Sequence, residues 1–113
     1  MGNKYGYNGK MGGGNSMQSL MKQAQQMQQK LIEAQQQLEE LQVTGTASGG
    51  MVSITCNGKK EILAVSIKPE VVDADDVEML EDLVLAAIND AYSKAKAEED
   101  RLMAPFAAMK GLM

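Results

Sequence analysis

The side chains best suited to chemistry in this chain are cations, placed at its two ends. Before Glu33 every charged side chain is a lysine, and after the all-acid stretch from Glu70 to Asp90 bases return with Lys94, mixed with acids. Lysine and arginine bind phosphate oxygens with little sequence preference and strong salt dependence. The charge pattern therefore predicts phosphate-backbone contacts at five candidate nucleic-acid-binding residues: Lys22, Lys30, Lys94, Lys96 and Arg101.

The chain has few of the residue types that catalytic and metal sites use. The chain has no histidine, the commonest metal ligand and general base. The net charge is −4, and every charged residue from Glu70 to Asp90 is an acid. We interpret these acids as helix capping and solvation rather than as a metal site. Gly12, Gly13 and Gly14 lack the preceding strand and the Gly-Lys-Ser/Thr of a phosphate loop. We expect no enzyme activity, cofactor, metal or small-molecule substrate.

The single cysteine, Cys56, leaves no disulfide framework within one chain. This fits a reducing compartment, and we expect the cytoplasm. No apolar run approaches the roughly 18–20 residues of a membrane span, and the N-terminus lacks the apolar core of a signal peptide. We expect no membrane association.

A long helix must position the N-terminal lysines. The stretch "MQSLMKQAQQMQQKLIEAQQQLEELQ", residues 17–42, contains no proline or glycine and is rich in glutamine. Its apolar residues alternate spacings of three and four, which is typical of a coiled-coil seam. Asn15 or Ser16 suits the N-cap. The predicted dimer-interface residues are those of the seam: Met17, Leu20, Ala24, Met27, Leu31, Ala34, Leu38 and Leu41.

The length of this helix favours a partner chain. At about 1.5 Å per residue it would be nearly 40 Å long, well beyond the size of so small a domain. The alternative is a helix that packs within a monomer. The glutamines keep the helix neutral, so its surface would not repel phosphate, although a merely soluble surface explains them equally well.

The segment "VTGTASGGMVSITCNGKKEILAVSI" reads as three antiparallel strands. A two-residue loop at Gly49-Gly50 pairs Ser48 with Met51 and puts Val43 and Ala47 on one face with Val52, Ile54 and Cys56. For the second turn we expect Cys56 to pair with Glu61, because this register brings Leu63, Val65 and Ile67 to the same apolar face. Cys56 is then a buried packing residue rather than a nucleophile.

A second helix follows Lys68-Pro69. Asp75 as N-cap with Glu78 three residues later resembles a capping box. The apolar spacing continues to about Met103, and Pro105 ends the pattern. A sheet with one apolar face needs helices on that face, so the fold class is α+β, with a helix, a three-stranded antiparallel meander and a helix.

The order and wording of "MKQAQQMQQKL", "VTGTASGGMVSITCNGK" and "EMLEDLVLAAINDA" resemble the YbaB/EbfC family of bacterial nucleoid-associated proteins, over roughly Met17 to Lys96. The resemblance implies an intertwined homodimer with projecting helices that binds DNA in the bacterial cytoplasm, with a role in nucleoid organisation or gene expression. It assigns no individual DNA contact, because the family has no short motif that does so. We divide the chain into a flexible glycine-rich lead (1–15), one domain (16–103) and a short tail (104–113).

Two functions remain in competition. The first is a nucleoid-associated homodimer that holds duplex DNA by backbone and shape, with the two groups of cations brought together as a clamp. The second is a protein-interaction module that uses the helical seam, which suits the net acidity better. Salt-dependent binding to unrelated duplexes distinguishes them.

Overall fold

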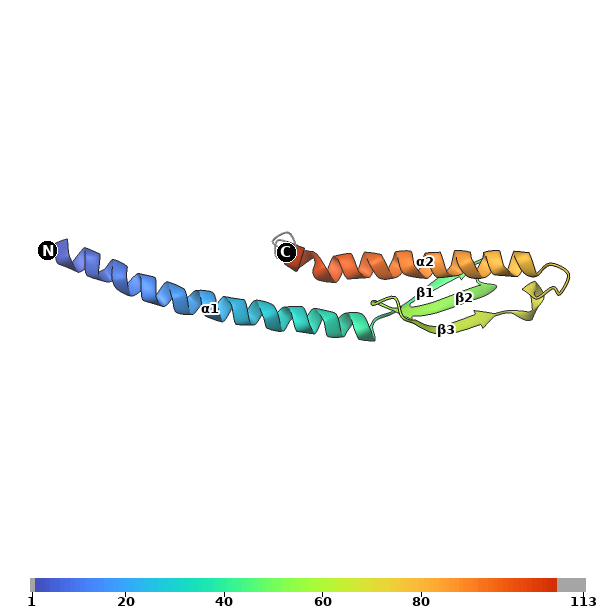
Figure 1. Cartoon of the computed structure of the whole chain (residues 1–113), viewed down its shortest axis with the longest axis horizontal. Helices are drawn as coiled ribbons and strands as arrows, with labels where there is room; N and C mark the ends of the chain where they lie inside the picture. The colour runs from blue at the N-terminus through green and yellow to red at the C-terminus, as the bar shows by residue number, and fades with distance from the viewer. Residues whose placement is uncertain (1, 108–113) are drawn as a thin grey trace. The chain divides into compact units, whose positions relative to one another are not determined.

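A computed structural model describes the backbone of residues 2–107 and the side chains of residues 16–107. Figure 1 shows the helices α1 (Gly2–Glu40) and α2 (Val77–Met103) and the strands β1 (Gln42–Ala47), β2 (Val52–Asn57) and β3 (Ile62–Ile67). Two short 3-10 turns, η1 (Pro69–Val71) and η2 (Ala104–Phe106), flank α2. The chain divides into two compact units, with the boundary after Glu33. The element order confirms the predicted α+β class.

Helix α1 begins before the predicted cap. It starts at Gly2, so a cap at Asn15 or Ser16 is wrong. Each glycine costs about 1 kcal/mol relative to alanine, but this segment has no proline, and adding turns to an existing helix needs no new nucleus. The division of the chain into a lead and a domain at residue 16 stays a prediction.

At its other end, α1 stops at Glu40, and the N–H of Leu41 donates to the carbonyl of Gln37 over 2.8 Å. Leu41, the last predicted seam position, thus closes the final turn rather than lying within α1. Next to it, the N–H of Gly58 donates to the carbonyl of Leu38 over 2.7 Å. A Cβ at position 58 would lie 3.0 Å from the Cα of Leu38, so only glycine allows this approach.

The sheet has the order β1-β2-β3, with antiparallel pairs. Val43 lies opposite Cys56, and Ala47 lies opposite Val52, which confirms the predicted register of the first hairpin. The strand pairing ends at Ala47 and Val52, so the loop is Ser48–Met51 rather than two glycines. Three of its residues have positive φ (Ser48, Gly49 and Gly50), and the two glycines lower the cost of this turn.

The predicted pairing of Cys56 with Glu61 is wrong. From Val52 to Thr55 the strands pair two residues away from the predicted register, and a bulge follows. Ile54 lies opposite Val65, and a β-bulge between Thr55 and Cys56 then brings Cys56 opposite Ile62. A shift of two residues leaves each side chain on its own face, so the apolar face was predicted correctly.

The side chain of Asn57 explains the bulged turn. Its Oδ1 accepts the N–H groups of Lys59 (2.9 Å) and Glu61 (3.0 Å), and its Nδ2 donates to Oε1 of Glu61 over 2.8 Å. These bonds hold a turn in which Lys60 adopts a φ of 68°. A side chain that bonds its own loop in this way competes with the regular ladder.

Helix α2 covers β1 and β2. Ala87, Ala91 and Ala95 pack against Val52, Ile54 and Cys56, and all six are fully buried. The helix approaches closely at Gly45, where an added Cβ would lie 2.6 Å from the Cα of Ala91. Small residues on both sides therefore set the distance between helix and sheet.

The start of α2 is shifted by one residue from the prediction. Asp76, not Asp75, is the N-cap, and its carboxylate accepts the N–H of Met79 over 3.2 Å. The helix ends at Met103 as predicted, and Pro105 lies in η2. The next residue, Phe106, is buried.

Candidate nucleic-acid interface

Lys22 and Lys30 lie on α1 and are exposed. They are eight residues apart, which places them about 12 Å apart along the helix axis and about 80° apart around it. The helix carries no acid between Ser16 and Ile32. Neither lysine forms an ion pair with any side chain in residues 16–107. Both ammonium groups are therefore available to an external anion.

The three candidates on α2 are each paired with an acid of the same helix. Lys96 lies 3.3 Å from Asp100, and Nε of Arg101 lies 2.7 Å from Glu98. Both pairs are solvent-exposed, and such pairs stabilise a protein by about 0–1 kcal/mol. A phosphate can replace these carboxylates at little cost.

Lys94 differs from the other two because it also bonds the backbone of β1. Its Nζ donates to the carbonyl of Thr44 over 2.8 Å and lies 3.2 Å from Oδ2 of Asp90. The same Oδ2 accepts the N–H of Thr46 over 2.9 Å. This N–H, and then Lys94, hold the pKa of Asp90 below its usual range. Binding of phosphate by Lys94 would compete with its bond to β1.

Three further lysines with described side chains were not among the predicted contacts. Lys59 and Lys60 lie in the β2–β3 turn and Lys68 follows β3, and all three are exposed. Lys59 pairs with Glu39 over 2.9 Å. Lys59 and Lys60 stand in the segment "NGKK", which we interpreted only for the register of the strands.

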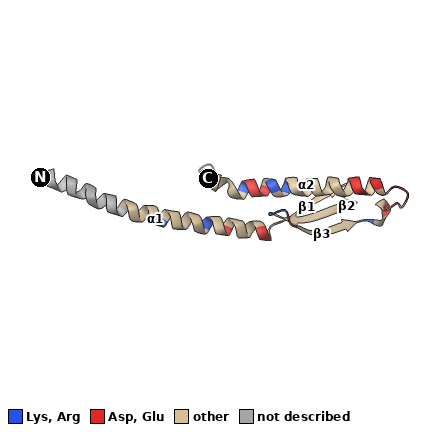
Figure 2. Ribbon diagram, in the orientation of Figure 1, with Lys and Arg blue, Asp and Glu red and all other residues tan. Residues whose placement is uncertain are grey.

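Acids and bases are unevenly distributed along α2 and the loop before it. Figure 2 shows acids at the start of α2 and in the preceding loop, and all the bases of α2 in its C-terminal half. The start of α2 would repel a phosphate backbone more than the C-terminal half does, where Glu98, Glu99 and Asp100 offset the three bases.

Solvent exposure varies along the predicted seam. Ala34 and Leu38 are buried within their own unit, and Met27, Leu31 and Leu41 are half-buried. Met17, Leu20 and Ala24 are exposed. The N-terminal part of the seam, from Met17 to Leu31, thus keeps the most apolar surface available to a partner.

Other kinds of site find little support in the described residues. None of their helices is both long enough and apolar enough to cross a membrane. Within the same residues no three His, Cys, Asp or Glu side chains gather where they could hold a metal ion. Cys56 is fully buried as predicted, and its thiol donates to the carbonyl of Ala91 over 3.7 Å. Burial raises the pKa of this thiol, which keeps it in the unreactive protonated form.

Comparison with known proteins identifies the family of the chain and a solved structure with a similar fold. The model of the YbaB/EbfC DNA-binding family matches residues 11–111. A nucleoid-associated protein of Clostridium novyi is 54% identical over 88 residues, which is 78% of this chain and 77% of the relative. Another from Rhodococcus opacus is 50% identical over 96 residues, 85% of each chain. An uncharacterized protein of Helicobacter pylori has a similar crystal structure, with a TM-score of 0.67, 22% identity, and coverage of 78% of this chain and 92% of that chain.

Proposed function

Because the chain belongs to the YbaB/EbfC DNA-binding family, we propose that it binds duplex DNA as a homodimer, through the phosphate backbone and the shape of the duplex. Relatives at about 50% identity are named nucleoid-associated proteins. We extend that association to this chain, with a place on the nucleoid in the bacterial cytoplasm and a role in nucleoid organisation or gene regulation.

The proposed contact surface rests mainly on Lys22 and Lys30. Both are exposed, unpaired within the described residues, and set in an acid-free part of α1 covered with glutamine. Lys96 and Arg101 add two cations whose weak surface pairs exchange readily for phosphate. Lys94 contributes less, since it is bonded to β1.

The chain is poorly equipped to read base sequence. Arg101 is its only arginine, so a pair of arginines on neighbouring guanines is impossible within one chain. Of the aromatic residues with described side chains, Tyr92 is half-buried and Phe106 is buried, so neither forms a stacking platform for single-stranded bases. These features support backbone recognition of duplex DNA with weak sequence preference.

The homodimer is supported by the small core of one chain. The largest fully buried side chains are only Ile54, Val52 and Cys56, whereas Met17, Leu20, Val65, Leu85 and several other large apolar side chains are exposed. A domain of this size is marginal even with its apolar surface well covered. A second copy would cover part of this surface.

The test is a fluorescence-anisotropy titration of several unrelated duplexes, each about three helical turns long, over a range of salt. We expect affinities that barely differ between sequences and fall steeply with salt. Lys22→Gln and Lys30→Gln should each lower the salt slope by about 0.9 for every phosphate that the variant no longer neutralises, up to about two phosphates per dimer. Lys68→Gln is the matched control, because it removes the same charge beside the acidic segment and should leave the slope unchanged.

A second function is favoured by the exposed apolar residues of the seam. If the folded chain fails to bind any duplex even at low salt, the chain is a protein-interaction module rather than a DNA-binding protein. If binding occurs but Lys22→Gln and Lys30→Gln match the Lys68→Gln control, the contacts lie elsewhere. Lys96→Gln and Arg101→Gln are then the next variants.

A further inference from the structure

The turn between β2 and β3 contains an asparagine followed directly by a glycine, Asn57-Gly58. In a flexible chain this pair deamidates readily, because glycine has no side chain to shield its amide nitrogen. That nitrogen attacks Cγ of the asparagine, a cyclic imide forms, and ammonia leaves. Water then opens the ring at one of its two carbonyls, which gives aspartate or isoaspartate. The reaction therefore needs water but no enzyme, oxidant or reductant.

The folded turn occupies the groups that this reaction would consume. The N–H of Gly58 donates to the carbonyl of Leu38 over 2.7 Å, and the cyclic imide has no hydrogen on that nitrogen. The leaving group would be Nδ2 of Asn57, which donates to Oε1 of Glu61 over 2.8 Å. Asn57 is only 4% exposed, and Gly58 is buried. Ring closure would break both hydrogen bonds, and buried polar groups are costly to leave unpaired.

The same turn is bound to the end of α1. The bond from Gly58 to Leu38 joins the two backbones, and Nζ of Lys59 lies 2.9 Å from Oε1 of Glu39. The backbones are so close that a Cβ at position 58 would lie 3.0 Å from the Cα of Leu38. All of these residues belong to one compact unit, 34–113. We call residues 57–61 the docking turn, because they hold the last residues of α1.

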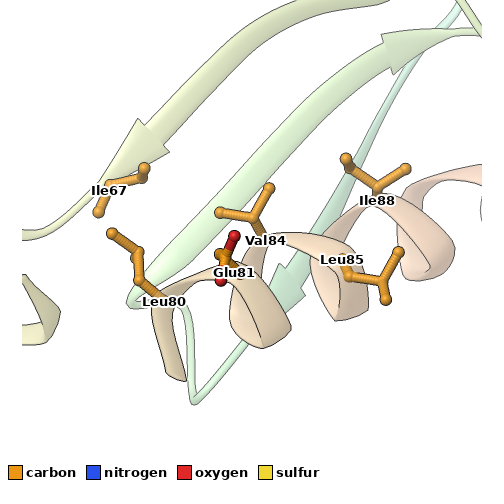
Figure 3. A pocket seen from close by; sticks show the side chains of 6 residues that line it. All are labelled: Ile67, Leu80, Glu81, Val84, Leu85 and Ile88. Carbon is orange, nitrogen blue, oxygen red and sulfur yellow. The ribbon is translucent and has the colours of Figure 1, made fainter. Parts of the chain in front are cut away.

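Helix α2 gives β3, which follows the docking turn, little support. Leu63 and Val65 of β3 remain 51% and 56% exposed. A groove of about 410 Å³ lies between β3 and α2, and Figure 3 shows Ile67 and Leu80 pointing toward one another across it. Within the turn, Lys60 has a φ of 68°, which is unfavourable for a residue with a Cβ. The closed turn thus depends on the bonds of Asn57 and on its contact with α1.

We propose that Asn57 is a deamidation site that the docking turn protects, and that its conversion prevents the end of α1 from docking again. In the aspartate product, a carboxylate oxygen replaces Nδ2 beside Oε1 of Glu61. Two negative groups at hydrogen-bond distance repel each other, so the bond that closed the turn becomes a repulsion.

Isoaspartate prevents docking by a different route. Its main chain passes through the former side chain, which inserts an extra methylene group between residues 57 and 58. The N–H of Gly58 is then displaced from the carbonyl of Leu38, where the approach of the two backbones leaves no spare room. Both products therefore favour the open turn. A chain that opens for long enough is converted to a form that stays open.

The first test compares deamidation in the folded chain and in guanidinium chloride at the same pH and temperature. Conversion is measured by peptide mapping with mass spectrometry, which detects the replacement of NH2 by OH. We expect Asn57 to react about tenfold or more slowly in the folded chain, because reaction requires local opening. In denaturant, Asn8-Gly9 carries the same pair of residues and should react at a rate similar to that of Asn57. Equal rates at Asn57 in the folded and unfolded chains would overturn the proposal.

A pair of variants tests the role of Glu61. Glu61→Ala removes the acceptor of Nδ2 and should speed the conversion of Asn57 several-fold in the folded chain. Glu61→Gln is the matched control, because its side-chain carbonyl can still accept that hydrogen bond. If the alanine and glutamine variants both react at the rate of the unchanged chain, Glu61 does not protect Asn57. The comparison of the unchanged chain in and out of denaturant still decides the proposal if the alanine variant fails to fold.

The loss of docking is measured by hydrogen exchange at the amide of Gly58. We expect this amide to exchange about tenfold or more rapidly in the purified deamidated chain and in Asn57→Asp than in the unchanged chain. Adding Glu61→Gln to Asn57→Asp should restore protection, because an amide then faces the new carboxylate. This rescue distinguishes repulsion at the turn from general unfolding. Unchanged protection of Gly58 in the deamidated chain would overturn the predicted effect on α1.

Discussion

Replacing Gly45 by alanine is the sharpest test of how α2 packs on the sheet. The new Cβ would lie 2.6 Å from the Cα of Ala91, and closer still to backbone atoms of Ala87 and Ala91. Carbon atoms that touch are normally about 3.5–4.0 Å apart, so the helix must move away by roughly 1 Å. Backbone atoms cannot avoid the clash by changing rotamer.

The cost follows from what that movement separates. Ala87 and Ala91 pack on Ile54 and Cys56, which are fully buried. A gap of about 0.5–1 Å removes about a quarter to a half of the dispersion energy between such groups. Overpacking a core costs about 1–3 kcal/mol, while alanine regains about 0.5–1 kcal/mol over glycine in a strand. Because the clash is with backbone atoms, we expect a net destabilisation near the upper end of that range, about 2 kcal/mol.

The assay is urea unfolding followed by circular dichroism at one fixed protein concentration, because the stability of the proposed dimer would depend on concentration. Gly49→Ala is the matched control. Nothing lies within 4 Å of its added Cβ, so its only cost comes from its φ of 66°, and that cost is about 1 kcal/mol. If Gly45→Ala destabilises the chain no more than Gly49→Ala, the reasoning from the close packing of α2 on β1 is refuted.

Three further predictions concern other parts of the structure. Because Cys56 is buried and its pKa is raised, its reaction with a thiol reagent at mildly alkaline pH should be roughly 100-fold slower in the native chain than in urea; equal rates would mean an accessible thiol. The pKa of Asp90 is lowered chiefly by the N–H of Thr46. Its stabilising effect is therefore present above the ordinary value of about 3.9 and disappears as pH falls through the lower folded value, and the Thr46 amide shift should titrate below that ordinary value by NMR. Leu31→Lys should raise the dimer dissociation constant about tenfold or more in analytical ultracentrifugation, because it places a charge in the apolar seam; Gln29→Lys, which adds the same charge outside the seam, should have little effect.

The register of the strands shows where prediction from the sequence succeeded and where it stopped. Alternation of apolar and polar residues placed Val65 and Ile67 correctly on the face of Ile54, because side-chain direction in a strand repeats every two residues. The bulge at Cys56 could not be predicted from that alternation. It depends on hydrogen bonds that the side chain of Asn57 makes with the turn.

The candidate cations likewise include some properties that the sequence shows and others that only the tertiary structure shows. Their positions along the chain, and the absence of acids around Lys22 and Lys30, are properties of the sequence alone. The role of Lys94 is not, because its partner Thr44 is fifty residues away in the chain. A lysine engaged by a backbone carbonyl and a lysine open to phosphate look identical in a sequence.

The sequence by itself determined the elements, their order and their apolar faces, since these depend on interactions within a few residues. Only the tertiary structure decided which strand α2 leaves uncovered. That choice depends on Gly45 meeting Ala87 and Ala91, which lie far along the chain, and this approach draws the helix over β1 and leaves β3 open. Such contacts join surfaces that no local pattern relates, so the open edge of the sheet appears only when the chain is folded.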